Sequence, residues 1–353
     1  MIHKTLRSII CNLKRLSCLT ILLVAPICAN AADPNLTPEL LRLYEWNPGN
    51  TLAPLILPVR AAETPENAAQ RYLHELSKNT DLLELFLGRS PDLPLQGFKP
   101  LASTDREQRA LMIANLPKDL TLNSERVQNF KTIFAQAKHQ SYILPLAADL
   151  GLSRGEAKDL QQQIALKFPL LVAIGGEDVT PAAYGAEDFH ARNTVPRRDQ
   201  FELELIKSYV KYEKGFLLGV CRGSQISAVA LGYKLIQDLP FHKGTRIEHS
   251  NNWHPIEVLN TKNNLLKSIA GEQRHLTVNS LHHQSVIYHP GGPLEVAARS
   301  HDGTVEATEL KNGRGLLLQY HPELMGNALG TQIIHSVLRY KNTVMPRMCS
   351  QIL

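Results

Sequence analysis

A cysteine stands between two glycines at the end of an apolar run. The segment "GFLLGVCRGSQ" places Cys221 two residues after Gly219 and two residues before Gly223. Where a buried strand turns sharply into a helix at such a G-x-C-x-G, the thiol is presented at the turn and the first helical amides favour the thiolate. The glycines let the strand and the helix approach each other closely. The pattern therefore indicates a cysteine nucleophile, and the alternative is an inert thiol in an ordinary glycine-containing turn.

A partner for this thiol stands near the C-terminus. The segment "GLLLQYHPE" ends an apolar run in Gln319, His321 and Glu323. Residues two apart in an extended segment point to the same side, so Glu323 can hold the His321 imidazole in one tautomer while the other ring nitrogen faces Cys221. A thiol nucleophile needs such a base, and the base needs an orienting group. We therefore predict Cys221, His321 and Glu323 as catalytic residues for acyl transfer; taken alone, the His-Pro-Glu segment also fits a surface pair.

The elements that must position these residues alternate between strand and helix from about residue 108. The expected order is strand "RALMIANLP", helix "SERVQNFKTIFAQA", strand "SYILPLA", helix "GEAKDLQQQIAL", strand "FPLLVAIGG", helix "RRDQFELELIKSYVKYEK", strand "GFLLGV" and helix "GSQISAVALG". Such alternation predicts an α/β fold in which helices flank both faces of a mostly parallel sheet.

Residues 32–107 have a different character. Prolines occur at intervals, and leucine-rich patches such as "TPENAAQRYLHELSKNTDLLELFLG" have helical spacing, with Thr64 as a helix cap and Pro65 in the first turn. We expect a mainly helical N-terminal extension that covers or shapes the site and carries no catalytic set. Residues 108–353 are the predicted catalytic domain.

The first 31 residues predict an export signal. Lys4, Arg7, Lys14 and Arg15 precede the apolar stretch "LSCLTILLVAPIC", and small residues follow in "ANA". This order is typical of a secretory signal peptide, so we expect cleavage after Ala31 and a periplasmic or secreted protein. An uncleaved membrane anchor is the alternative, but the apolar run is shorter than a bilayer span. No later segment is apolar enough to cross a membrane, so we expect no stable membrane insertion after cleavage.

The net charge bears on nucleic-acid binding, and the cysteine count bears on whether Cys221 is a free thiol. The formal net charge is +5, and the leader contributes four of its positive charges and no acid, so the remainder is close to neutral and gives no electrostatic case for nucleic acid. Three of the five cysteines lie in the leader, which leaves Cys221 and Cys349. An exported protein could join these two in a disulfide, but the surroundings of Cys221 favour a free, reactive thiol.

Histidine is frequent in one part of the chain. The sequence has 14 histidines. Six of them fall in one stretch: His242, His249, His254, His275, His282 and His283. An exported, histidine-rich stretch suggests zinc, but no pair has a defined ligand spacing with a supporting acid. We therefore expect no metal and no other cofactor.

Several further segments carry a family resemblance. "GVCRGSQ" and "QYHPE" resemble the class I glutamine amidotransferase domain. Other segments are similar to its γ-glutamyl hydrolase branch, which includes bacterial γ-glutamyl-γ-aminobutyrate hydrolases: "IGGEDVTPAAYG", "RRDQFELELI", "LIQDLP", "VNSLHHQSV" and "SHDGTVEATEL". The motifs follow the family order and cover roughly residues 108–330.

The resemblance implies a flavodoxin-like sheet and hydrolysis of γ-glutamyl amide or peptide bonds through a glutamyl thioester. It implies that backbone N–H groups of Gly176 and Arg222 form the oxyanion hole. It also implies four substrate-binding residues: Gln225, Asn279, Ser280 and His282. The implied partner is a small γ-glutamyl compound, and whether the protein is a homo-oligomer stays open. A glutaminase subunit that supplies ammonia to a synthase and a non-catalytic binding protein are the alternatives.

Overall fold

The computed structural model describes residues 39–48, 51, 53–77, 95–102, 105–113, 124–145, 151–244 and 249–344. These residues belong to one compact unit, Glu39–Leu353. The predicted signal segment with its cleavage site, and Cys349, lie outside the described residues, so both expectations stay predictions. Within the described ranges, no helix combines the length and the apolar character that a membrane span requires.

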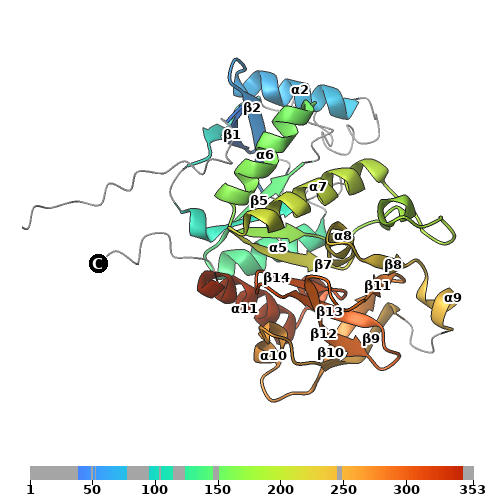
Figure 1. Cartoon of the computed structure of the whole chain (residues 1–353). Coiled ribbons are helices and arrows are strands. Elements are labelled where there is room, and N and C mark those ends of the chain that lie inside the picture. The colour runs from blue at the N-terminus through green and yellow to red at the C-terminus, as the bar shows by residue number, and fades with distance from the viewer. Residues whose placement is uncertain are drawn as a thin grey trace, which may run out of the picture. The chain divides into compact units, whose positions relative to one another are not determined.

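One twelve-stranded sheet forms the centre of this unit (Figure 1). Its strand order is β10-β9-β12-β13-β14-β7-β6-β4-β5-β2-β1-β3. The parallel centre consists of β2 (Leu55–Arg60), β4 (Arg109–Ile113), β5 (Gln140–Leu144), β6 (Leu170–Ala173), β7 (Phe216–Val220) and β14 (Gly315–Leu318). The antiparallel flanks consist of β1 (Leu41–Trp46), β3 (Phe98–Pro100), β9 (Ser250–Val258), β10 (His275–Leu281), β12 (Leu294–Ser300) and β13 (Val305–Leu310).

Helices cover both faces of the parallel centre. Every residue of β4, β6, β7 and β14 is buried, as expected for parallel strands that lie between two helical layers. In one layer α6 (Arg154–Lys167) contacts α7 (Pro196–Tyr212), which contacts α8 (Arg222–Ala230). In the other, α5 (Glu125–Gln136) contacts α11 (Ala328–Val344), which contacts α10 (Leu265–Ala270).

The predicted α/β fold with its parallel sheet is confirmed, and the antiparallel flanks extend it. Each strand and helix expected between residues 108 and 232 is present in the expected order.

The local sequence explains where two of these helices begin. The Ser124 side chain accepts a hydrogen bond from Val127 N at the start of α5, and Ser153 and Glu156 form a reciprocal capping box at the start of α6.

The N-terminal region differs from the mainly helical extension that we predicted. The described part of residues 32–107 holds one helix, α2 (Pro65–Ser77), but also the strands β1, β2 and β3. Thr64 caps α2 as expected, since its hydroxyl accepts from Asn67 N at 3.3 Å. The strands β1 and β2 continue the sheet beyond β5, at the end opposite β9 and β10 (Figure 1). The strands were missed because the partner of β2 is β5, which is remote in the sequence and supplies the burial that local spacing does not show. The domain boundary at residue 107 stays a prediction.

The remaining elements are short. A separate two-stranded sheet pairs β8 (Lys234–Ile236) with β11 (Ser285–Ile287), and α9 (Leu239–Lys243) follows β8. Three single turns of 3₁₀-helix complete the described elements: η1 (Arg106–Gln108), η2 (Pro181–Tyr184) and η3 (Pro322–Leu324). Of these, η3 follows β14 and carries Glu323, and η2 follows the loop after β6 that contains Gly176.

Candidate active site

Three neighbouring parallel strands bring the predicted catalytic residues to one edge of the sheet. Strand β7 lies between β6 and β14, with Leu318 paired to Val220. Because parallel strands end at the same edge, the residues after all three strands meet there. Cys221 follows β7 directly, and its N–H donates to Leu318 O at 2.7 Å. His321 follows β14, so the register of these two strands sets the position of the thiol beside the imidazole.

The turn at Cys221 has the strained backbone expected of a nucleophile at the end of a strand. Cys221 has φ 52° and ψ −113°, a conformation that a side chain normally avoids. A Cβ on Gly219 would lie 2.8 Å from Gly223 O, and a Cβ on Gly223 would lie 1.8 Å from Ala173 O. Both glycines are therefore required by the close approach of α8 to β7 and β6, and they hold Cys221 in its unusual conformation.

The imidazole is fixed on two sides. His321 Nδ1 lies 2.7 Å from Glu323 Oε1, and both side chains are buried. The Asn279 amide binds the backbone of the same histidine, donating to His321 O at 3.0 Å and accepting from His321 N at 3.0 Å. With Nδ1 held by the carboxylate, Nε2 is the nitrogen left to exchange a proton with the thiol.

The electrostatics favour a protonated imidazole. Burial alone would lower the pKa of His321, but the negative charges of Glu323 and Cys221 and hydrogen bonds to both groups raise this pKa to about 10. An imidazolium beside Cys221 in turn stabilises the thiolate, as in other cysteine–histidine pairs. The three residues that the sequence predicted are thus brought into one electrostatic unit.

The two amides predicted to bind a developing oxyanion lie at the start of α8 and in the loop after β6. The Cys221 thiol itself points to a carbonyl, with Sγ 4.0 Å from Leu281 O. Arg222 N belongs to the first turn of α8, where amides have no partner within the helix. Gly176 follows β6, and a Cβ on the preceding Gly175 would lie 2.7 Å from His321 Cε1, so this loop passes directly beside the imidazole. Arg222 is thus adjacent to Cys221 in the chain and the Gly176 loop passes beside His321, while an oxyanion hole formed by these two amides stays a prediction.

A buried ionic network, which the sequence analysis did not assign to the site, supports these amides. The Arg222 guanidinium binds Glu202 and Asp199, both on α7. Glu202 Oε1 also accepts from Arg198 Nε at 2.6 Å, and Arg198 Nη1 donates to Glu177 Oε2 at 2.7 Å in the loop after β6. Burial alone would raise the pKa of Glu202, but the two guanidinium groups lower it, so the carboxylate is charged. The R-D-x-x-E motif of α7 therefore ties the residue after the nucleophile to the oxyanion loop.

A second network of charged side chains joins three segments that carry family motifs, around Asp178, Asp238 and His283. His283 Nε2 lies 2.8 Å from Asp178 Oδ2, and His283 Nδ1 lies 3.3 Å from Asp238 Oδ2. Arg192 Nη2 also donates to Asp238 Oδ2 at 2.9 Å. Burial alone would lower the pKa of His283, but the two carboxylates raise it. The loop after β6, which carries Gly176, is therefore bound by α7 through Glu177 and by His283 through Asp178. Asp238 in turn binds His283.

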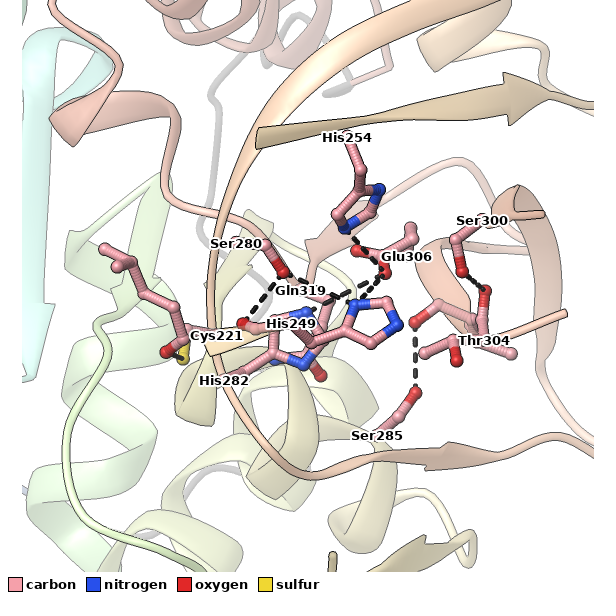
Figure 2. A network of polar contacts seen from close by, with 12 residues as sticks. Cys221, His249, His254, Ser280, His282, Ser285, Ser300, Thr304, Glu306 and Gln319 are labelled. Carbon is pink, nitrogen blue, oxygen red and sulfur yellow. Dashed lines mark hydrogen bonds and ion pairs between the residues drawn. The ribbon is translucent and has the colours of Figure 1, made fainter. Parts of the chain in front are cut away.

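The side chains of the four residues assigned to substrate binding already have partners within the protein, and Figure 2 shows two of them, Ser280 and His282, together with Cys221. Gln225 Nε2 donates to Gln319 Oε1 at 3.2 Å, and Asn279 holds His321. Ser280 Oγ donates to His249 O at 2.9 Å, and His282 Nδ1 lies 3.0 Å from Gln284 O. Contact of these residues with substrate stays a prediction.

One group of residues that could hold a metal also emerges from the fold. His249, His254, His282 and Glu306 are buried, and their potential ligand atoms all lie within 4.8 Å of one another. In the sequence no acid stands at a defined ligand spacing from these histidines. The fold supplies one, because β13 carries Glu306 to them from a distant part of the chain.

Comparisons with known proteins identify the family of the chain. The family model of peptidase C26 matches residues 121–323. The chain is 34% identical over 199 residues to the glutamine amidotransferase-like protein YvdE of Lactococcus lactis, covering 56% of this chain and 79% of that protein. It is 30% identical over 209 residues to protein NtpR of Enterococcus hirae, covering 56% and 82%. A crystal structure of a glutamine amidotransferase from Thermotoga maritima superposes with a TM-score of 0.43 at 16% identity, covering 68% of this chain and 94% of that one. The chain therefore belongs to the peptidase C26 family of glutamine amidotransferase-type hydrolases.

Proposed function

We propose that this protein hydrolyses γ-glutamyl amide or peptide bonds through a thioester on Cys221. The observation that carries the proposal is the His321 imidazole, which is bound to Glu323 at 2.7 Å and has its pKa raised by the charges of Glu323 and Cys221. Such a pair supplies both a nucleophile and a proton donor for acyl transfer. The γ-glutamyl specificity rests on the resemblance of the loop and strand motifs to the γ-glutamyl hydrolase branch.

The chemistry follows from the positions of the groups. The thiolate attacks the γ-carbonyl carbon, and the oxygen that becomes negative faces the amides of Gly176 and Arg222. His321 gives its proton to the leaving nitrogen as the C–N bond breaks, which leaves a glutamyl thioester and a neutral imidazole. The imidazole then removes a proton from water, whose oxygen attacks the thioester, releases glutamate and restores the thiolate.

A panel of substrates tests this proposal. We expect the purified protein to hydrolyse γ-glutamyl amines or γ-glutamyl dipeptides with a higher kcat/KM than glutamine, because its loop and strand motifs resemble those of the γ-glutamyl hydrolase branch. Release of glutamate is the common measurement, so every substrate is compared on one scale. Preference for glutamine would favour the second candidate, a glutaminase subunit. Binding without release from any substrate would favour a non-catalytic binding protein and would contradict the proposal.

We also propose that the protein acts outside the cytoplasm, on a periplasmic or extracellular γ-glutamyl compound. The support is the sequence of residues 1–31, with its basic start, apolar stretch and small residues before the expected cleavage after Ala31. Intact-mass measurement of the protein from its native cell should give a chain that begins at Ala32. A full-length chain recovered from the cytoplasm would contradict export without affecting the proposed chemistry.

The charge of Glu323 should set the alkaline limit of activity. In Glu323→Gln the amide oxygen still accepts a hydrogen bond from His321 Nδ1, but the negative charge that raises the pKa of His321 is lost. The active pair requires protonated His321, so its population falls as the pH rises through this pKa, which is about 10 in the wild type. We expect the alkaline limb of the kcat/KM profile to move to lower pH, with a loss of about 10²-fold at the optimum.

The control for this variant is Glu272→Gln, which removes an equal charge at an exposed position. Its pH profile should superimpose on that of the wild type. An alkaline limb of Glu323→Gln that stayed in place would show that Glu323 does not set the protonation of His321.

A further inference from the structure

The histidine cluster, defined as His249, His254, His282 and Glu306, lies behind the reacting thiol (Figure 2). Its members come from separate segments: the residue before β9, β9 itself, the residue after β10, and β13. The three imidazoles are at most 6% exposed and Glu306 is fully buried. None of the four belongs to the proposed triad, so their arrangement needs a separate explanation.

Hydrogen bonds fix the tautomers of all three imidazoles. His249 Nε2 lies 3.1 Å from Asp302 Oδ2, His254 Nδ1 lies 3.3 Å from Pro255 O, and His282 Nδ1 lies 3.0 Å from Gln284 O. A carboxylate and two carbonyl oxygens only accept, so each of these nitrogens carries a hydrogen. In the neutral rings the opposite nitrogens therefore carry lone pairs.

These lone pairs converge on one carboxylate. Glu306 Oε1 lies 3.3 Å from His249 Nδ1, 3.7 Å from His254 Nε2 and 3.7 Å from His282 Nε2. Ser280 Oγ is a further neighbour, 3.4 Å from His249 Nδ1, and it also donates to His249 O. Figure 2 shows the three rings arranged around the Glu306 carboxylate. Neutral imidazole lone pairs facing a buried carboxylate repel it, so this arrangement requires a positive charge at its centre.

A proton alone does not meet this requirement. His249 Nδ1 lies 3.3 Å from Glu306 Oε1, so one proton can bridge these two atoms. Among the described residues, His254 Nε2, His282 Nε2 and both oxygens of Glu306 have no hydrogen-bond partner. Even with a proton between His249 Nδ1 and Glu306 Oε1, three of these buried polar atoms stay without a partner in the described part of the chain: His254 Nε2, His282 Nε2 and Glu306 Oε2.

We propose that the histidine cluster binds one divalent transition-metal ion, and that Zn²⁺ suits its three imidazoles and one carboxylate best. Bonds of about 2.0–2.1 Å in a tetrahedral shell separate ligand atoms by about 3.4 Å. The three distances to Glu306 Oε1 are close to this value, and all the potential ligand atoms lie within 4.8 Å of one another. The contact of His249 Nε2 with Asp302 is the carboxylate–histidine arrangement that orients and strengthens a metal-binding imidazole.

The position of the ion implies a structural role. Four protein ligands close a tetrahedral shell and leave no position for substrate or water. The ion would join β9 and β13 to the end of β10, the strand whose Asn279 holds the backbone of His321 and whose Leu281 carbonyl faces Cys221 Sγ at 4.0 Å. It would therefore fix the strand that supports the active site, and this inference does not depend on which bond the enzyme hydrolyses.

Metal content and stability of the wild-type chain give the first test. The ligands are buried, so the ion should enter as the chain folds. Protein unfolded in urea with a chelator is refolded either in metal-free buffer or with one equivalent of ZnCl₂, passed over a desalting column and analysed by mass spectrometry for zinc. We expect about one retained zinc per chain and a higher thermal unfolding midpoint in the zinc sample. No retained zinc and an unchanged midpoint would overturn the proposal, whatever the variants do.

Glu306→Gln gives the second test, because it separates a metal site from a hydrogen-bonded cluster. The amide has nearly the shape of the carboxylate and can donate to the free nitrogens of His254 or His282. Without a metal, the variant should therefore be as stable as the wild type or more stable. With a metal, retained zinc should fall at least tenfold and the zinc-dependent rise in midpoint should disappear.

His275→Ala is the matched control, since this histidine is exposed on β10 and outside the cluster. It should retain zinc as the wild type does. Equal zinc retention by Glu306→Gln and the wild type would overturn the assignment of the ligands.

Discussion

Replacing Cys221 by alanine should lower kcat on the best γ-glutamyl substrate by at least about 10⁴-fold, because no other group can form the acyl intermediate. The exposed fraction of Cys221 is 7%, and alanine occupies its place without a new clash, so circular dichroism and thermal unfolding should stay close to those of the wild type. Acid-quenched wild-type enzyme should show a glutamyl adduct on the peptide that contains Cys221. The variant should show none.

His321→Ala should be almost as severe, since the thiolate loses its counter-charge and the leaving amine loses its proton donor. The two substitutions together should cost little more than either alone, because the residues act as one unit. Cys349→Ala is the control for a general effect of removing a thiol and should keep wild-type kcat. Wild-type turnover by Cys221→Ala would exclude the proposed mechanism even if the preferred substrate remained a γ-glutamyl compound.

Glu202→Gln should lower the free energy of unfolding by about 3–5 kcal/mol, the cost of removing one partner from a buried ion pair. Glu202 binds both Arg198 and Arg222, and each of these three side chains is almost fully buried. The amide loses the charge that balances the two guanidinium groups and turns one N–H₂ group toward them. Urea-induced unfolding measures the change, and kcat should fall as well because Arg222 and the loop after β6 lose their common anchor.

Glu204→Gln is the matched control on the same helix. Glu204 is exposed, so removing its charge should change the free energy of unfolding by less than about 0.5 kcal/mol. Equal stability of Glu202→Gln and the wild type would show that the paired charges contribute no net stability to the fold. The activity of the two variants would then decide whether the network positions the oxyanion loop.

The catalytic arrangement could be predicted because each of its parts is encoded locally. The glycines around Cys221 and the spacing of His321 and Glu323 at the end of an apolar run are visible within a few residues of sequence. The fold then needs only parallel pairing of β7 with β14 to join the two segments. The same holds for the alternating strands and helices between residues 108 and 232, whose apolar spacing and caps are local signals.

Features that depend on contacts between distant segments could not be predicted in this way. The strands β1 and β2 are stabilised by pairing with each other, and β2 also pairs with β5, so no local signal distinguished them and the region was interpreted as mainly helical. The histidine cluster draws its ligands from separate segments, with the acid on β13, and no spacing rule links them. The role of Glu202 was missed for the same reason, because its partner Arg222 lies on another helix.

The register of β14, β7 and β6 restricts how the length of this chain can change. Cys221 and His321 keep their separation only while Val220 stays opposite Leu318 and Gly219 stays opposite Ala173. A deletion or insertion of one residue inside any of these strands would turn alternate side chains to the other face of the sheet and displace the reacting groups. Extra residues in the connections between strands and helices would leave them in place. Insertions and deletions that separate this chain from remote relatives should therefore fall in the connections, and the three strands give the fixed points for aligning them.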